Sequence, residues 1–163
     1  MNVKNTTSPR FSAGFTLVEL LMTIIIGAIL VSIAVPSFTN LMRRNQITTY
    51  ANEFGTAVNL ARSEAIKRGT SISITSNSGT NWTQGWTVNV VSSGELLRTA
   101  PALTGDNTFN SGVNGTVTFN SRGSTTLGAE ETWSLCNASV TAGRQIRIAV
   151  TGRISVREIT PCP

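Results

Sequence analysis

Residues 14–35 of the chain have the sequence GFTLVELLMTIIIGAILVSIAV, and this stretch decides the fold. The twenty-one residues from Phe15 to Val35 are predominantly apolar and are interrupted by a single carboxylate, Glu19. As a helix with a rise of about 1.5 Å per residue, they would span about 30 Å, the thickness of the hydrocarbon core of a bilayer. The stretch therefore predicts one membrane-spanning helix near the N-terminus.

The segment before this helix, residues 1–14, carries Lys4 and Arg10 and no acidic residue. Basic residues that flank a membrane span stay on the cytoplasmic side, so the rest of the chain is expected outside the cytoplasm. A secretory signal has its small-residue cleavage site after the apolar core, whereas here the small residue Gly14 precedes it. Cleavage at Gly14 would therefore remove a leader and leave the anchor attached.

Glu19 is the residue in the apolar run that calls for a partner. A carboxylate at the centre of a membrane helix costs about 2.5–3.5 kcal/mol on insertion scales, so an acid there marks a candidate functional site. Its charge needs a cation. The alternative is a plain single-pass anchor with an isolated acid.

The motif GFTLVEL, residues 14–20, resembles the class III signal of type IV pilins and type II secretion pseudopilins. The resemblance implies that a prepilin peptidase cuts between Gly14 and Phe15 and methylates the new amino terminus of Phe15. It also implies that Glu19 meets the N-terminal ammonium of a neighbouring subunit during assembly, which would supply the cation.

A helical pattern continues beyond Pro36, which should kink or loosen the helix where it leaves the apolar segment. Apolar residues recur at spacings of three and four, and Gly69 follows a basic last turn as a candidate C-cap. The helix is therefore predicted from about Phe15 to Arg68, with its second half packed on a head domain. The apolar stripe comprises Ile47, Ala51, Phe54, Val58, Ala61 and Ala65.

The remaining residues, 70–163, are expected to form an antiparallel β-rich head, because short runs of Val, Ile, Thr and aromatic residues alternate with turn-forming clusters. Trp82 and Trp86 are expected to pack against the helix stripe, with a ligand platform as the alternative. The expected strands cover residues 71–75, 86–91, 96–98, 116–120, 132–135, 145–150 and 154–158.

The two cysteines, Cys136 and Cys162, have a spacing that fits neither a zinc site nor a C-x-x-C redox motif. A disulfide is a simpler interpretation than two buried thiols, and it requires an oxidising compartment such as the periplasm. Closing this loop would stabilise the head by about 3.5 kcal/mol in the chain-entropy model. The chain has no histidine, which excludes Ser/His/Asp and Cys/His catalysis. We therefore expect no enzyme activity, no metal site and no cofactor.

Arginines accumulate in the last third of the chain, and the net charge of the whole chain is +5. If residues 154–158 form a strand, Arg153 and Arg157 lie on one face about 13 Å apart, where they could meet phosphates of DNA. The alternative is a solvated edge strand whose charges discourage aggregation. The candidate DNA-binding residues are Arg144, Arg147, Arg153 and Arg157.

Residues 59–69, NLARSEAIKRG, are similar to the helix end of the family that joins the secretion pseudopilin GspH with the minor pilins FimT and FimU. Residues 82–86, WTQGW, resemble the family pattern before its second strand. Members that bind DNA are thought to use a Gly-Arg-x-Arg segment, and here Ser155 replaces the second arginine. The cysteine pair near the chain end looks more like FimU than like GspH.

The resemblance implies an α+β pilin fold, in which a long N-terminal helix packs on an antiparallel sheet. It implies a minor pilin of the tip or priming complex of a type IV pilus, with a type II secretion pseudopilin and a DNA-binding minor pilin of natural transformation as alternatives. Expected partners are other pilins or pseudopilins, prepilin peptidase, the inner membrane and, as a further candidate, DNA. The expected parts are a leader (1–14), a transmembrane half-helix (15–35), a periplasmic half-helix (36–69) and a periplasmic head (70–163).

Overall fold

The computed structural model describes residues 14–112 and 115–162. Residues 1–13, which hold most of the expected leader, lie outside the described residues, as do residues 113, 114 and 163. The chain divides into two compact units between Phe38 and Thr39, and the helix α1 (Leu17–Arg68) belongs to both. The other elements are β1 (Ile72–Ser76), the 3₁₀ helix η1 (Trp82–Gln84), β2 (Trp86–Val90), β3 (Leu96–Ala100), β4 (Asn107–Ser111), β5 (Thr116–Phe119), β6 (Glu131–Asn137), β7 (Val140–Ile148) and β8 (Ile154–Ile159).

The described part of the first unit is the apolar end of α1. This is the one helix among the described residues that is long and apolar enough to cross a membrane. Its large apolar side chains are exposed, with Leu17 at 79% and Ile24 at 63%. Such a surface is not stable in water, so it requires lipid or other apolar helices around it. The backbone remains helical through Pro36.

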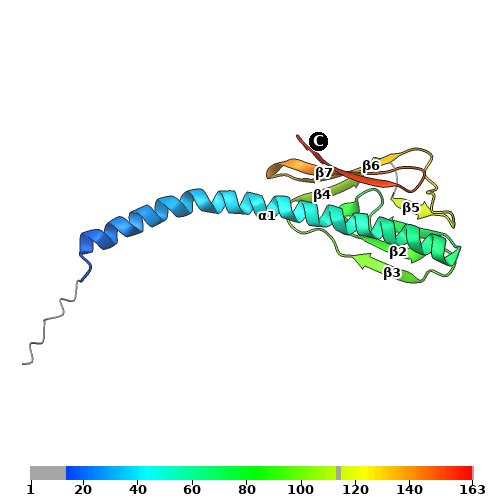
Figure 1. The fold of residues 1–163 in the computed structure, drawn as a ribbon, viewed down its shortest axis with the longest axis horizontal. Coiled ribbons are helices and arrows are strands. Elements are labelled where there is room, and N and C mark those ends of the chain that lie inside the picture. The colour runs from blue at the N-terminus through cyan, green and yellow to red at the C-terminus, as the bar shows by residue number, and fades with distance from the viewer. Residues whose placement is uncertain (1–13, 113–114, 163) are drawn as a thin grey trace, which may run out of the picture. The chain divides into compact units, whose positions relative to one another are not determined.

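The second unit contains the C-terminal half of α1 and two antiparallel sheets of four strands each (Figure 1). The strand order is β3-β2-β1-β5 in the first sheet and β4-β6-β7-β8 in the second. All seven expected strands are present, and the architecture is the predicted α+β one, in which a long N-terminal helix packs on antiparallel β-structure. The antiparallel head therefore consists of two sheets that share one helix.

Both sheets are needed to bury the predicted helix stripe. Phe54 lies at the centre of the core, and the centroids of four aromatic rings lie 5.0 to 5.9 Å from its ring. Trp82 and Trp86 are two of these four rings and are 0% and 2% exposed, which confirms core packing and excludes the ligand platform. The six predicted stripe residues are all buried: Ile47, Ala51, Phe54, Val58, Ala61 and Ala65.

Sequence analysis missed β4 and the first half of β7. In β4, Phe109 is the one large apolar residue among polar neighbours that favour turns, so the alternation is weak. In β7, Gly143 interrupts the pattern five residues before the end of the strand. An added Cβ at Gly143 would collide with the sulfur of Cys162 and the carbonyl oxygen of Leu135. Close packing therefore requires a glycine inside this strand.

The end of α1 is fixed by a cap and by ion pairs. Gly69 has a φ of +65°, the left-handed conformation of a helix C-cap, as predicted. Arg68 Nε lies 2.6 Å from Glu64 Oε2, and its Nη1 lies 2.8 Å from Glu95 Oε2 in the β2–β3 connection. The hydrogen bond from Arg68 lowers the pKa of Glu64, against a smaller opposing effect of desolvation. The pair with Glu95 ties the helix end to the connection between two strands of the first sheet.

We predict that Phe54→Ala lowers the free energy of unfolding by about 3–5 kcal/mol, because it removes the ring on which four aromatic side chains pack. Chemical denaturation of the full chain in detergent micelles, followed by tryptophan fluorescence, measures the change. The control is Asn59→Ala on the exposed side of the same helix, which should change the value by less than about 0.5 kcal/mol. Equal effects of both variants would contradict the central role of Phe54.

Candidate functional site

The first turn of α1 holds the residues that the leader motif singles out. Gly14 and Phe15 precede the helix and are exposed, with Phe15 at 76%. A Cβ added to Gly14 would meet nothing within 4 Å among the described residues. Packing within the described residues therefore does not require a glycine at position 14. A requirement for glycine at this position would instead come from an enzyme that cleaves the chain there.

Thr16 caps the helix, and Glu19 is the third residue of its first turn. The Oγ1 of Thr16 accepts a hydrogen bond from the backbone N–H of Glu19 at 3.2 Å, and its carbonyl oxygen accepts one from Leu20 at 3.1 Å. Thr-x-x-Glu is the sequence of a capping box, and a negative charge in the first turn interacts favourably with the helix dipole. Sequence analysis missed this capping role of Thr16, although the spacing of Thr16 and Glu19 signals it.

The predicted disulfide between Cys136 and Cys162 is present in the structure, with Cα atoms 5.9 Å apart. It joins β6 to the segment that follows β8, and the backbone N–H of Cys162 donates to the carbonyl oxygen of Thr141 at 2.9 Å. The C-terminal segment is thereby held on the second sheet at two points. The bond spans 26 residues and closes β7 and β8 into one loop.

Three of the four candidate arginines are engaged in contacts within the head. Arg147 and Arg157 both donate through Nε to Gln145 Oε1, at 3.3 and 2.6 Å, which places their side chains on the same face of the second sheet. Arg147 also forms an ion pair with Glu130 at 3.5 Å. These contacts occupy guanidinium groups that would otherwise be free to meet phosphates.

Arg144 lies on the opposite face of β7, toward α1. Its Nη1 lies 2.6 Å from Glu158 Oε2, and its Nη2 donates to Thr48 Oγ1 at 3.2 Å. Arg153 precedes β8, and among the described residues no carboxylate pairs with it. The four arginines therefore do not form one surface.

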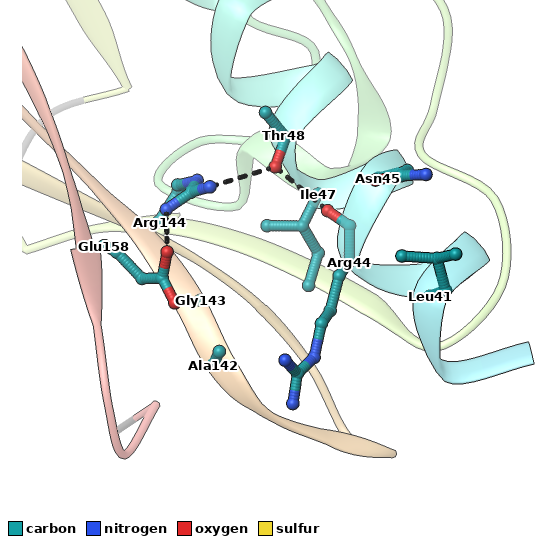
Figure 2. A pocket seen from close by; sticks show the side chains of 9 residues that line it. All are labelled: Leu41, Arg44, Asn45, Ile47, Thr48, Ala142, Gly143, Arg144 and Glu158. Carbon is teal, nitrogen blue, oxygen red and sulfur yellow. Dashed lines mark hydrogen bonds and ion pairs between the residues drawn. The ribbon is translucent and has the colours of Figure 1, made fainter. Parts of the chain in front are cut away.

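A cavity of about 220 Å³ lies between α1 and the β7–β8 pair. Figure 2 shows Arg144 bridging Glu158 and Thr48 on one side, while the side chain of Arg44 extends from α1 toward Ala142 on the other. The lining combines a carboxylate and guanidinium groups with apolar side chains. It is a groove of mixed charge and holds none of the arrangements of nucleophile and base that catalysis requires.

Three features together define a pilin-like protein. They are a long helix with an exposed apolar segment, an acidic residue in the capped first turn of that helix, and a β-rich head that is closed by a disulfide. Comparison with known proteins supports this assignment to the pilin-like class. Residues 50–152 match the family model described as Type II transport protein GspH, and residues 9–35 match that of the prokaryotic N-terminal methylation motif. The chain belongs to the GspH family. Among curated protein sequences, none matches it.

Two similar solved structures are crystal forms of the type IV minor pilin FimU from Pseudomonas aeruginosa strain PAO1. In the first, the chain is 26% identical over 76% of its own length and 99% of that chain, with a TM-score of 0.64. In the second, identity is 26% over 71% and 99%, with a TM-score of 0.60. Together, these matches support a minor pilin role over secretion and DNA uptake.

We predict that Cys136→Ser combined with Cys162→Ser lowers the free energy of unfolding by about 3.5 kcal/mol, because the unfolded chain gains the freedom of an open loop. Denaturation of the full chain in micelles, with and without a reductant, measures this. Reduction of the native chain should reproduce the loss and leave the double variant unchanged. A reductant effect on the double variant would contradict this assignment.

Proposed function

We propose that the chain is a minor pilin subunit that joins the tip or priming complex of a type IV pilus. The observation that carries the proposal is the match of 76% of the chain to the minor pilin FimU over 99% of that chain, together with the N-terminal methylation motif. Its mechanism is assembly rather than catalysis. A type II secretion pseudopilin is the alternative within the same family.

Residues 15–35 would anchor the subunit in the inner membrane as a single span, with residues 36–69 and the head in the periplasm. The exposed apolar surface of this segment supports the proposal, because lipid can cover it before assembly and like helices can cover it afterwards. Other pilins are therefore the expected partners of the helix. The disulfide fits an oxidising compartment such as the periplasm.

Prepilin peptidase would cut between Gly14 and Phe15 and methylate the amino group of Phe15. Both residues are exposed, as a protease requires of its substrate. Cleavage would leave a positive charge near the start of α1, and Glu19 lies in the first turn of the same helix. Between neighbouring subunits, the ammonium of Phe15 and the carboxylate of Glu19 would pair in an apolar environment, where unpaired charges are costly. That pair would set the register of assembly.

We predict that Gly14→Arg blocks removal of the leader, because the peptidase must accommodate residue 14 closely while the chain itself does not constrain it. Immunoblotting of host membranes should show the precursor alone. Gly27→Ala, also at an unconstrained glycine, is the control and should be processed normally. Mature-sized protein from Gly14→Arg would refute the cleavage site.

We predict that Glu19→Ala leaves cleavage intact but lowers the amount of the subunit in sheared filaments at least ten-fold. Glu19→Gln tests the charge alone, because glutamine has the size of glutamate but no charge, and the hydrogen bond from the backbone N–H of residue 19 to Thr16 Oγ1 does not depend on the side chain. The amount of the Glu19→Gln variant in sheared filaments should fall as far as that of Glu19→Ala. Normal incorporation of the glutamine variant, measured by immunoblotting of sheared filaments, would count against the ammonium pair.

Deletion of the corresponding gene in the host distinguishes the pilus from secretion. We expect loss of surface pili and of twitching motility, with the culture supernatant unchanged. Restoration by the native chain and not by Glu19→Ala ties the phenotype to assembly. Unchanged piliation together with retention of secreted proteins in the periplasm would favour the secretion alternative.

A further inference from the structure

Three arginines from distant parts of the sequence converge beside the C-terminal end of α1. Arg62 of α1 donates through Nε to the carbonyl oxygen of Gly123 at 3.1 Å. A Cβ added to Gly152 would meet that same oxygen and would lie 3.2 Å from Arg62 Nε. Arg122 and Arg153 adjoin these two glycines, and consecutive Cα atoms are about 3.8 Å apart. The loop after β5, the β7–β8 turn and α1 therefore meet at one place.

Among the described residues, the structure pairs no carboxylate with Arg62, Arg122 or Arg153. The nearby acids in the sequence are used elsewhere: Glu64 pairs with Lys67 and Arg68, Glu130 pairs with Arg147, and Glu131 is buried. Arg122 and Arg153 are exposed. The result is a cluster of positive charge on the surface that the head itself does not neutralise.

Two exposed apolar side chains belong to the same region. Ile66 is 52% exposed, and its Cδ1 lies 2.7 Å from where a Cβ on Gly123 would be, so it packs closely on this loop. Val150 is 42% exposed, and its carbonyl oxygen accepts hydrogen bonds from Thr125 N and Oγ1 at 2.8 and 3.1 Å. We define the arginine patch as Arg62, Ile66, Arg122, Val150 and Arg153.

The composition of the arginine patch favours a protein partner over a nucleic acid. Arginine is enriched in protein interfaces and in the residues that carry most of their binding energy. The exposed apolar side chains of Ile66 and Val150 would gain nothing against a phosphate backbone, whereas a protein surface can cover them. The charge requires an acidic partner, because a positive surface is matched by a negative one.

A second copy of this chain does not fit that requirement. Five of its glutamates form ion pairs within the described part of the head, Glu131 is buried, and Glu19 lies in the apolar part of α1. Asp106 is the acid that remains. The five paired residues are Glu53, Glu64, Glu95, Glu130 and Glu158.

We propose that the arginine patch docks an acidic surface on the head of a different pilin-like subunit. The proposal rests on the function proposed above, since it names the surface through which this subunit contacts its neighbour in the complex. Docking would bring carboxylates to Arg122 and Arg153 and would cover Ile66 and Val150.

Co-purification of full-length subunits tests this proposal. The tagged chain is co-expressed with each other subunit of the host that carries an N-terminal methylation motif, and complexes are isolated from membranes in detergent. Arg122→Glu and Arg153→Glu should each lower the recovery of one acidic-headed subunit at least ten-fold. Arg157→Glu, which makes the same change of charge in β8, is the matched control and should retain recovery within two-fold. Replacing a glutamate of the partner by arginine should restore binding to Arg153→Glu.

Different outcomes separate the two proposals. Recovery of other subunits that is equal for the native chain and both patch variants would overturn the arginine patch and leave the minor pilin role intact. Absence of every subunit from complexes of the native chain would count against both.

The probe for the competing ligand is a 30-base-pair duplex DNA, with binding to the full chain followed by fluorescence anisotropy. Loss of DNA binding in the patch variants with unchanged subunit recovery would assign the arginine patch to nucleic acid instead.

Discussion

The burial of the stripe on α1 between two sheets is the interaction on which the rest of the head depends. A four-stranded sheet with one apolar face needs a second layer, and here one helix supplies it to both sheets. Phe54 illustrates the arrangement, because its ring contacts aromatic side chains contributed by η1, β2, β4 and β6. Both sheets therefore contribute to one core that is built around this helix.

This dependence links the anchor to the head through one continuous element. The C-terminal half of α1 contributes to the core of the head. The N-terminal half of the same helix carries the exposed apolar segment, with Glu19 in its capped first turn. In the proposed role, assembly through the helix and recognition through the head would therefore be separate tasks on one chain. The apolar segment needs surroundings without water, whereas the head is already closed by its core and its disulfide.

Charge is distributed unevenly over the head for a physical reason. The chain has thirteen basic and eight acidic residues, and most acids of the head are used in ion pairs that fix the fold. Glu158 holds Arg144 beside α1, and Glu130 holds Arg147 on the sheet. The arginines without such partners remain available at the surface, where their charge can select a partner instead of stabilising the domain.

The sequence by itself determined the elements whose signals are local. Helix periodicity placed the buried stripe, Gly69 marked the helix end, and the apolar run indicated the anchor, since each follows from backbone geometry within a few residues. Only the tertiary structure decided which residues meet across long separations. The contact of Arg144 with Thr48 spans 96 residues, and that of Arg62 with Gly123 spans 61. Such contacts depend on strand order and on how the sheets pack around the helix, and no short sequence pattern encodes them.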